Sequence, residues 1–197
     1  MRFGGVRLGG VSKNGIIAVE IYDAGRSMKK IKDYLGNEHE IASCLGCEIA
    51  GSRIIAPGGV IYEDESFVLS GDPEIAIKGF LVINAKRHVN SLVELAKNER
   101  ANLIELITKA ANIVKELGFA DQVTILQEER SPHFHVWIFP TQDWMREKYG
   151  EGAAYIREIC ENVREEATTE ERQEVAGSIA KIKERFRSED AGIYAKI

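Results

Sequence analysis

Residues 133–139 alternate between two kinds of side chain, and this alternation constrains the fold more than any other feature of the chain. One set is apolar: Phe134, Val136 and Ile138. The other set carries polar or amphipathic rings: His133, His135 and Trp137. Successive side chains of a β-strand point to opposite faces, so the pattern predicts a strand with one buried face. The histidine face is then available to a ligand, although two surface histidines on a solvated sheet would give the same pattern.

The remaining periodic segments predict a mixed fold. Residues 98–117 form the clearest helix, because apolar side chains recur on one face: Leu103, Ile104, Ile107, Ala110, Ala111, Val114 and Leu117. Short apolar or alternating runs predict strands at residues 16–22, 60–62, 67–69, 79–84, 122–127 and 134–138. Further helices are expected at residues 28–35, 90–95, 142–148, 153–166 and 168–187. This order predicts an α+β fold: an antiparallel sheet of about five strands, with the long helix packed on it.

Composition divides the chain into three parts. Residues 1–27 are rich in glycine and form a poorly patterned N-terminal extension, and the helix expected from Met28 makes that residue a candidate start. Residues 28–142 hold the predicted sheet and its helix. Residues 143–197 form a charged C-terminal helical extension, which suits a solvated hairpin, a dimer arm or a lid equally well.

Charge and cysteine content narrow the class of protein. The formal charge of −5 argues against general nucleic-acid binding, which needs a basic face. The sequence has no run of about 20 apolar residues, the length that a membrane-spanning helix needs. Three cysteines are too few for a disulfide framework, and no secretory signal pattern opens the chain. We therefore expect a cytoplasmic protein without membrane contact, whose reduced thiols are available to a metal.

Residues 133–139 resemble the His-φ-His-φ-His-φ-φ motif of the histidine-triad (HIT) family, in which φ is apolar. Two histidines and every apolar position match, and Trp137 occupies the third histidine position. The preceding Ser131-Pro132 is similar to the Ser-x-Pro-His-x-His-x-Gln pattern of the related nucleotidylyltransferase branch, except that no residue separates the serine from the proline.

Three upstream segments extend the resemblance in the same order as in the family. Residues 44–51 are similar to Cys-x-x-Cys-x-Ile-x-x-Gly, and residues 60–65 resemble the Val-Tyr-Glu-Asp element. Residues 79–88 resemble Gly-His-φ-φ-Val-φ-Pro-Lys-x-His, with Phe80 in the histidine position and Ala85 in the proline position. The agreement covers residues 44–142 and implies a HIT-like fold, which commonly forms a homodimer.

The resemblance implies a nucleotide phosphate as substrate and His135 as the nucleophile. In the family the middle histidine attacks an α-phosphorus and forms a covalent nucleotidyl intermediate. A neutral imidazole suits this role, provided that an acceptor holds its other ring nitrogen, which in the family is a backbone carbonyl. A hydrolase or nucleotidyltransferase acting on a small-molecule nucleotide, such as a dinucleoside polyphosphate, is the function so implied.

Four other residues are candidates for substrate binding. Asp72 falls where the family places a residue on the ribose hydroxyls, and Ser131 resembles a serine that binds phosphate. Both also fit simple roles in turns. Arg130 could form paired hydrogen bonds with phosphate oxygens, although two adjacent glutamates favour a solvated charge. Trp137 is the fourth candidate, and Gln127 is a weaker one.

Trp137 also bears on the reaction. The third histidine of the family assists the leaving group, whereas an indole donates one hydrogen bond and cannot shuttle a proton. This substitution favours transfer, or a leaving group that needs no proton, over ordinary hydrolysis. Two alternatives stay open: Trp137 only packs against the C-terminal helices, or the chain is a non-catalytic, zinc-stabilised nucleotide-binding or regulatory module.

A zinc site is the remaining expectation. The Cys-x-x-Cys pair Cys44 and Cys47 alone fits redox chemistry or chance as well as metal binding. Several bacterial members of the resembling family bind zinc through positions that correspond to Cys44, Cys47, His88 and His133. These four make the Cys2His2 set of a closed structural site. His133 would then be a ligand rather than an acid or base.

Overall fold

The computed structural model describes residues 6–8, 19–21 and 29–194. Strands β1 (Val6–Leu8) and β2 (Val19–Ile21) pair with each other in antiparallel fashion. The strand predicted at residues 16–22 is therefore described only at its centre. Most of the predicted extension 1–27, and the candidate start Met28, lie outside the described residues.

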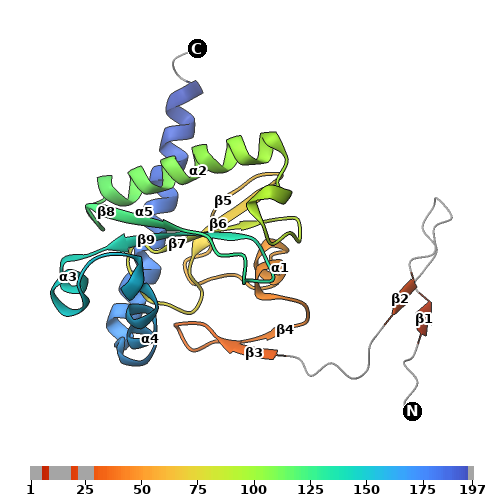
Figure 1. Cartoon of the computed structure of the whole chain (residues 1–197), viewed down its shortest axis with the longest axis horizontal. Helices are drawn as coiled ribbons and strands as arrows, with labels where there is room; N and C mark the ends of the chain where they lie inside the picture. Colours follow the sequence, from red (N-terminus) through yellow and green to blue (C-terminus); the bar gives the residue numbers. More distant parts are fainter. Residues whose placement is uncertain (1–5, 9–18, 22–28, 195–197) are drawn as a thin grey trace.

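A five-stranded antiparallel sheet forms the centre of the molecule (Figure 1). Its strands are β5 (Val60–Glu63), β6 (Phe67–Gly71), β7 (Leu81–Ala85), β8 (Gln122–Leu126) and β9 (His135–Thr141), in the spatial order β5-β6-β7-β9-β8. The α+β class, the antiparallel sheet of about five strands and the long helix upon it are thereby confirmed.

One face of the sheet packs against two helices, α2 (Lys97–Glu116) and α5 (Thr169–Tyr194). The sheet buries there Leu69, Leu81, Ile83, Val136 and Ile138, as the alternation in β9 predicts. Helix α2 contributes Leu103, Leu106, Ala110, Ile113 and Val114. One residue of the predicted apolar stripe does not face the core, since Ile104 is 59% exposed. Helix α5 adds Ile179, Ile182 and Phe186 to the same core.

The opposite face holds the shorter helices and a second core. Helices α3 (Asp143–Tyr149) and α4 (Ile156–Glu166), joined by the 3-10 turn η2 (Ala153–Tyr155), cover the end of the sheet that carries Phe80, Val82 and Phe139. Helix α1 (Leu45–Ala50) lies over β6 and β7 on this face. A further 3-10 turn, η1 (Leu92–Glu94), begins at the predicted cap Ser91. Among the described residues, no helix has the length and apolar content that crossing a membrane requires.

The helix expected at residues 28–35 is wrong. Strand β3 (Lys29–Lys32) instead pairs with β4 (Glu38–Ile41), forming a hairpin. Two cross-strand ion pairs stabilise this pairing at its exposed face: Lys30 with Glu40 and Lys32 with Glu38, both at 3.4 Å. Asp33 accepts the backbone N–H groups of Leu35 and Asn37 at 2.9 Å and so closes the turn. Cross-strand pairing of this kind overrides intrinsic helix propensity.

Strand β9 continues through Pro140, where the sequence predicts its end. Proline lacks the N–H group that a central strand needs on both sides. Beyond Ile138, however, β9 pairs only with β8, since its pairing with β7 stops at Leu81. Pro140 lies in this singly paired stretch, opposite Val123. The strand can therefore accommodate it.

A four-ligand cluster and the adjoining pocket

The start of α1 positions the two cysteines. Cys44 is the N-cap of this helix, and its Sγ accepts the backbone N–H of Cys47 at 3.3 Å. A cysteine at the cap and another in the first turn point to the same side of the helix end. Glu48 anchors the segment from within, because its buried carboxylate accepts hydrogen bonds from Ser43 and Arg53. The two thiols are thereby held beside the sheet.

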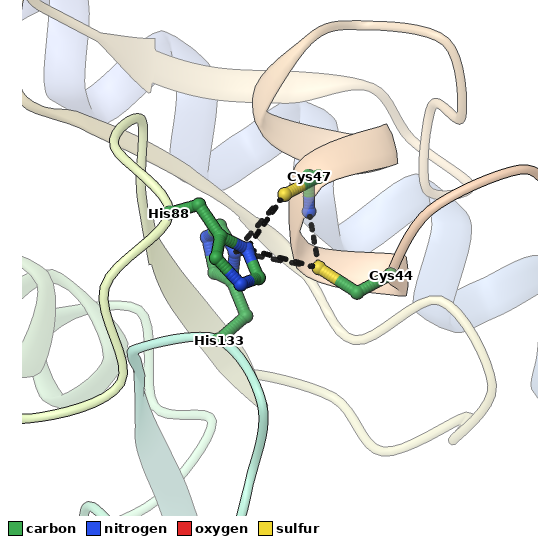
Figure 2. Close-up of side chains that lie close together, drawn as sticks. All are labelled: Cys44, Cys47, His88 and His133. Carbon is green, nitrogen blue, oxygen red and sulfur yellow. Dashed lines mark hydrogen bonds between the residues drawn. The ribbon is translucent and has the colours of Figure 1, made fainter. Parts of the chain in front are cut away.

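The two histidines come from the ends of neighbouring strands. His88 follows β7 and His133 precedes β9, and these strands pair with each other. His133 is buried, and its Nε2 donates to the carbonyl of Ala85 at 2.7 Å. This bond leaves Nδ1 of His133 without a proton in the neutral ring. That nitrogen faces the thiols (Figure 2).

The four side chains converge on one point (Figure 2). Their ligand atoms lie within 4.8 Å of one another. Nδ1 of His133 is 3.5 Å from each sulfur and 3.4 Å from Nδ1 of His88, which lies 3.0 Å from Sγ of Cys47 and 3.6 Å from Sγ of Cys44. A tetrahedral zinc ion with these ligand types has ligand-to-ligand edges of about 3.3–3.8 Å. The donor set therefore fits zinc.

Burial disfavours charge in this cluster when no cation is present. Desolvation, together with the neighbouring Cys44, raises the pKa of the Cys47 thiol to about 11. Desolvation also lowers the pKa of His133. A divalent cation would compensate for both effects by binding a thiolate and a neutral imidazole, with release of the thiol proton.

Gly46 allows the helix to approach His133 closely. A Cβ atom at this position would lie 2.3 Å from Cδ2 of the His133 ring, which is far inside van der Waals contact. Only glycine therefore fits at position 46 without displacing the His133 ring. Close contact with the His133 ring thus explains why the second spacer residue of Cys-x-x-Cys is glycine in this chain.

A pocket of about 410 Å³ adjoins the cluster on the same face of the sheet. Its floor comes from β7 and β9: Val82, Asn84, His135 and Trp137. Its walls come from the hairpin β3–β4, from α1 and from the loop after β6, and include Ile31, Ile41, Leu45, Ile49 and Asp72. Apolar walls around a few polar groups are typical of small-molecule sites.

His135 lies half-buried in this pocket with a defined tautomer. Its Nδ1 is 3.1 Å from the carbonyl oxygen of His133, which can only accept, so Nδ1 carries the proton of the neutral ring. Nε2 is then unprotonated and free to act as a nucleophile. This bond is the backbone-carbonyl contact that the sequence resemblance implies.

Three of the predicted substrate residues line the same pocket: Ser131, Asp72 and Trp137. Ser131 Oγ donates to the carbonyl of His133 at 2.9 Å, beside the bond from His135. Asp72 Oδ1 accepts the N–H groups of Glu74 and Ile75 at 2.8 and 2.9 Å, so it also serves its turn. Desolvation raises the pKa of Asp72 to about 6. Its carboxylate is thus poorly solvated, as at a pocket wall.

Trp137 lines the pocket and also packs against the second core. Its ring centroid is 5.9 Å from that of His135 and 5.3 Å from that of Phe80, which it meets edge to face. Phe80 occupies the first histidine position of the resembling pattern. Two aromatic rings thus stand in contact where that pattern has histidines.

The structure does not bring Arg130 or Gln127 into the pocket. Arg130 is exposed, and its Nε donates to Glu128 at 2.9 Å. Glu128 therefore offsets the charge of Arg130, as the sequence favours, and it also binds Arg157. Gln127 does not line the pocket.

Asn84 is the pocket residue that the sequence analysis missed. It is 3% exposed and lies opposite His135 in the pairing of β7 with β9. The sequence did offer a sign of it. Asn84 is a polar residue at the end of an apolar strand, where the HIT motif has an apolar side chain.

Comparison with known proteins places these features in context. No protein-family model matches the chain. An uncharacterised HIT-like protein from Methanocaldococcus jannaschii is 31% identical over 101 residues, which cover 47% of this chain and 76% of that protein. The crystal structure of a hypothetical histidine triad nucleotide-binding protein from Sulfolobus tokodaii is 20% identical, with a TM-score of 0.52 over 73% of this chain and 94% of that one. A zinc-bound histidine triad family protein from Mycobacterium smegmatis is 19% identical, with a TM-score of 0.49 over 73% and 97%.

Proposed function

This chain belongs to the HIT-like protein family, and from that premise we propose that it binds a nucleotide and transfers or hydrolyses it through His135. The observation that carries the proposal is the hydrogen bond from Nδ1 of His135 to the carbonyl of His133, in a pocket with apolar walls. This bond holds Nε2 of the neutral ring as a lone-pair donor toward the pocket.

The reaction follows from this geometry in two displacements. Nε2 of His135 attacks the α-phosphorus, the phosphorus–nitrogen bond forms, and the phosphorus–oxygen bond to the leaving group breaks with its electron pair on the oxygen. Nδ1 keeps its proton and, with the carbonyl of His133, stabilises the positive charge of the ring. Water or another acceptor then attacks phosphorus, loses a proton to solvent and releases His135.

Trp137 limits the leaving group. Because an indole cannot donate a proton as an acid, the departing oxygen must leave as an anion. A polyphosphate group meets this condition, whereas a poor leaving group such as an alcohol or amine does not. A nucleoside or dinucleoside polyphosphate is therefore the substrate class that the site favours.

The four-ligand cluster would hold zinc in a structural role. A zinc ion bound by Cys44, Cys47, His88 and His133 would fix the ring of His133 and tie α1 to the sheet. The carbonyl of the same residue orients His135. The cluster thus supports the nucleophile through the backbone of one shared residue.

Substitution of His135 tests the mechanism. The variant His135→Ala should lose detectable turnover of a dinucleoside polyphosphate, since the other pocket histidine, His133, directs its unprotonated Nδ1 toward the two thiols. The unfolding curve of the variant should stay close to that of the wild type. Rapid acid quench of the wild type with radiolabelled substrate should trap a nucleotidyl-histidine adduct. The matched control is His39→Ala, whose ring contacts Asp33 outside the pocket. Unchanged turnover in His135→Ala would reject the mechanism.

A non-catalytic nucleotide-binding or regulatory module is the second candidate function. The packing of Trp137 against Phe80 favours it, because aromatic rings in mutual contact occupy both histidine positions that differ from the family pattern. On this alternative the wild type binds nucleotide and forms no product or adduct in the same experiment.

A further inference from the structure

Asn84 is a buried residue whose side-chain Nδ2 donor is unpaired within the described part of the chain. Asn84 is 3% exposed, and its Nδ2 atom has no acceptor among the residues that the structure describes. Buried polar groups of folded proteins are paired in the great majority of cases, because an unpaired donor loses its bonds to water without replacement. An unpaired amide in the sheet interior therefore calls for an explanation.

Asn84 lies directly beside the nucleophile. In the antiparallel pairing of β7 with β9, Asn84 is the partner of His135, and both side chains line the pocket. Directly opposed residues on one face have Cβ atoms about 4.5–5.5 Å apart. A phosphate in contact with Nε2 of His135 would therefore lie within reach of the Asn84 amide.

The fold itself gives no reason for asparagine here. The other residues of β7 are apolar and buried, and asparagine is a poor strand former. A leucine of similar size would satisfy the strand and leave no donor unpaired. Residues that break local rules and lower stability without a structural return are typical of functional sites.

We propose that Asn84 binds the substrate phosphate, donating a hydrogen bond from its side-chain amide to a non-bridging oxygen of the phosphorus that His135 attacks. The terminal torsion of asparagine is soft, so the amide can turn its N–H toward an oxygen that enters the pocket. An uncharged donor at this point stabilises the charge that develops on the phosphoryl oxygens. The inference rests on the proposed function and names the residue that orients the substrate.

The first test separates a binding role from a structural one. Asn84→Leu removes the donor at nearly constant size, so the melting temperature should stay unchanged or rise, since an unpaired donor disappears. Its affinity for AMP, measured by isothermal titration calorimetry, should fall by about ten- to a hundredfold, which is the worth of one hydrogen bond to a charged group. Asn84→Asp should bind AMP more weakly still, because it opposes phosphate with a carboxylate.

The matched control changes an asparagine elsewhere. Nδ2 of Asn162 donates to the hydroxyl of Tyr149 at 2.8 Å, away from the His135 pocket. Asn162→Leu should lower the melting temperature and leave the affinity for AMP unchanged. This is the reverse of the pattern expected at Asn84.

A second measurement identifies which oxygen of the phosphate accepts the hydrogen bond from Asn84. The Rp and Sp diastereomers of adenosine 5′-O-(1-thiotriphosphate) replace one or the other non-bridging oxygen of the α-phosphate with sulfur, a weaker acceptor. The wild type should prefer one diastereomer in binding, and Asn84→Leu should lose most of that preference. A merely structural asparagine would not alter it.

The outcomes distinguish this inference from the proposed function. If the wild type binds AMP and Asn84→Leu binds it equally well, the inference about Asn84 is overturned and the role of His135 stands. If Asn84→Leu loses affinity while the wild type forms no product, the inference holds and the catalytic proposal fails. If the wild type binds no AMP, both are overturned.

Discussion

His133 contributes two different groups to the site. Its ring presents Nδ1 to the two thiols, because Nε2 is engaged by the carbonyl of Ala85. Its own carbonyl accepts from Nδ1 of His135 and from the hydroxyl of Ser131. A shift of the His133 ring therefore reaches His135 through the backbone of one residue. Groups that contact a reacting side chain in this way fix its orientation.

Asp72 should make stability depend on pH. Burial raises its pKa to about 6 from the ordinary 3.8, so between these pH values the folded chain holds a proton that the unfolded chain has lost. The contribution of Asp72 to stability should consequently fall as pH rises from about 4 to about 6 and stay level above. Asp72→Asn keeps the acceptor for Glu74 and Ile75 and carries no charge.

We expect Asp72→Asn to be more stable than the wild type by about 1–3 kcal/mol at pH 8, given the size of the shift and the partial exposure of the residue. The difference should shrink at pH 5. Urea unfolding at both pH values measures it. An equal difference at the two values would show that the carboxyl group titrates normally in the folded chain.

At the scale of elements, α5 belongs to the same core as the sheet. Ile179 packs on the backbone at Gly58 and Gly71, where Cβ atoms would lie 2.5 and 2.9 Å from its side chain. Phe186 lies 6.2 Å from Tyr62, measured between ring centroids, under the ammonium group of Lys109. The C-terminal extension was expected to be a solvated hairpin, a dimer arm or a lid. Because α5 packs into the core, it is not part of a purely solvated hairpin.

Phe186→Ala should therefore destabilise the whole protein. Removal of a fully buried phenylalanine costs about 3–5 kcal/mol through lost burial and the remaining cavity. Ile104→Ala is the matched control on the exposed side of α2, and we expect it to change stability by less than about 0.5 kcal/mol. Urea denaturation followed by circular dichroism measures both. Similar, small effects in the two variants would mean that α5 packs only loosely.

At the scale of the whole molecule, the cluster joins segments that are distant in sequence. Cys44 and Cys47 lie at the start of α1, whereas His88 follows β7 and His133 precedes β9, its partner strand. A bound zinc ion would cross-link these segments and stabilise the folded state by mass action. The expected homodimer and cytoplasmic location are separate matters and stay predictions.

Metal removal should lower both stability and turnover. We expect one zinc ion per chain by elemental analysis and a fall of several degrees in melting temperature after chelation, since metal at a hundredfold excess over its Kd contributes about 2.7 kcal/mol. Cys44→Ser should lose the ion, whereas Cys160→Ala should keep it, because Cys160 is buried against α3 and β7 residues away from the cluster. Retention of zinc by Cys44→Ser would exclude this cluster as the site.

Much of the sheet and of the cluster could be predicted from the sequence. The alternation in residues 133–139 assigns Val136 and Ile138 to the core and His135 to the opposite face, and the structure has the same arrangement. The helix predicted at residues 28–35 was wrong, because pairing with β4 makes this segment a strand. For Arg130 the sequence favoured a solvated charge beside two glutamates, and the structure has Arg130 exposed and paired with Glu128.

The sequence by itself determined which face of each element is apolar, because side-chain period follows from the local geometry of helices and strands. Only the tertiary structure decided which of these faces meet. It brought His88 to His133, set Asn84 opposite His135 and left Nδ2 of Asn84 without an acceptor among the residues described. Such contacts join residues far apart in the chain, and they depend on strand order and register, which no local pattern specifies.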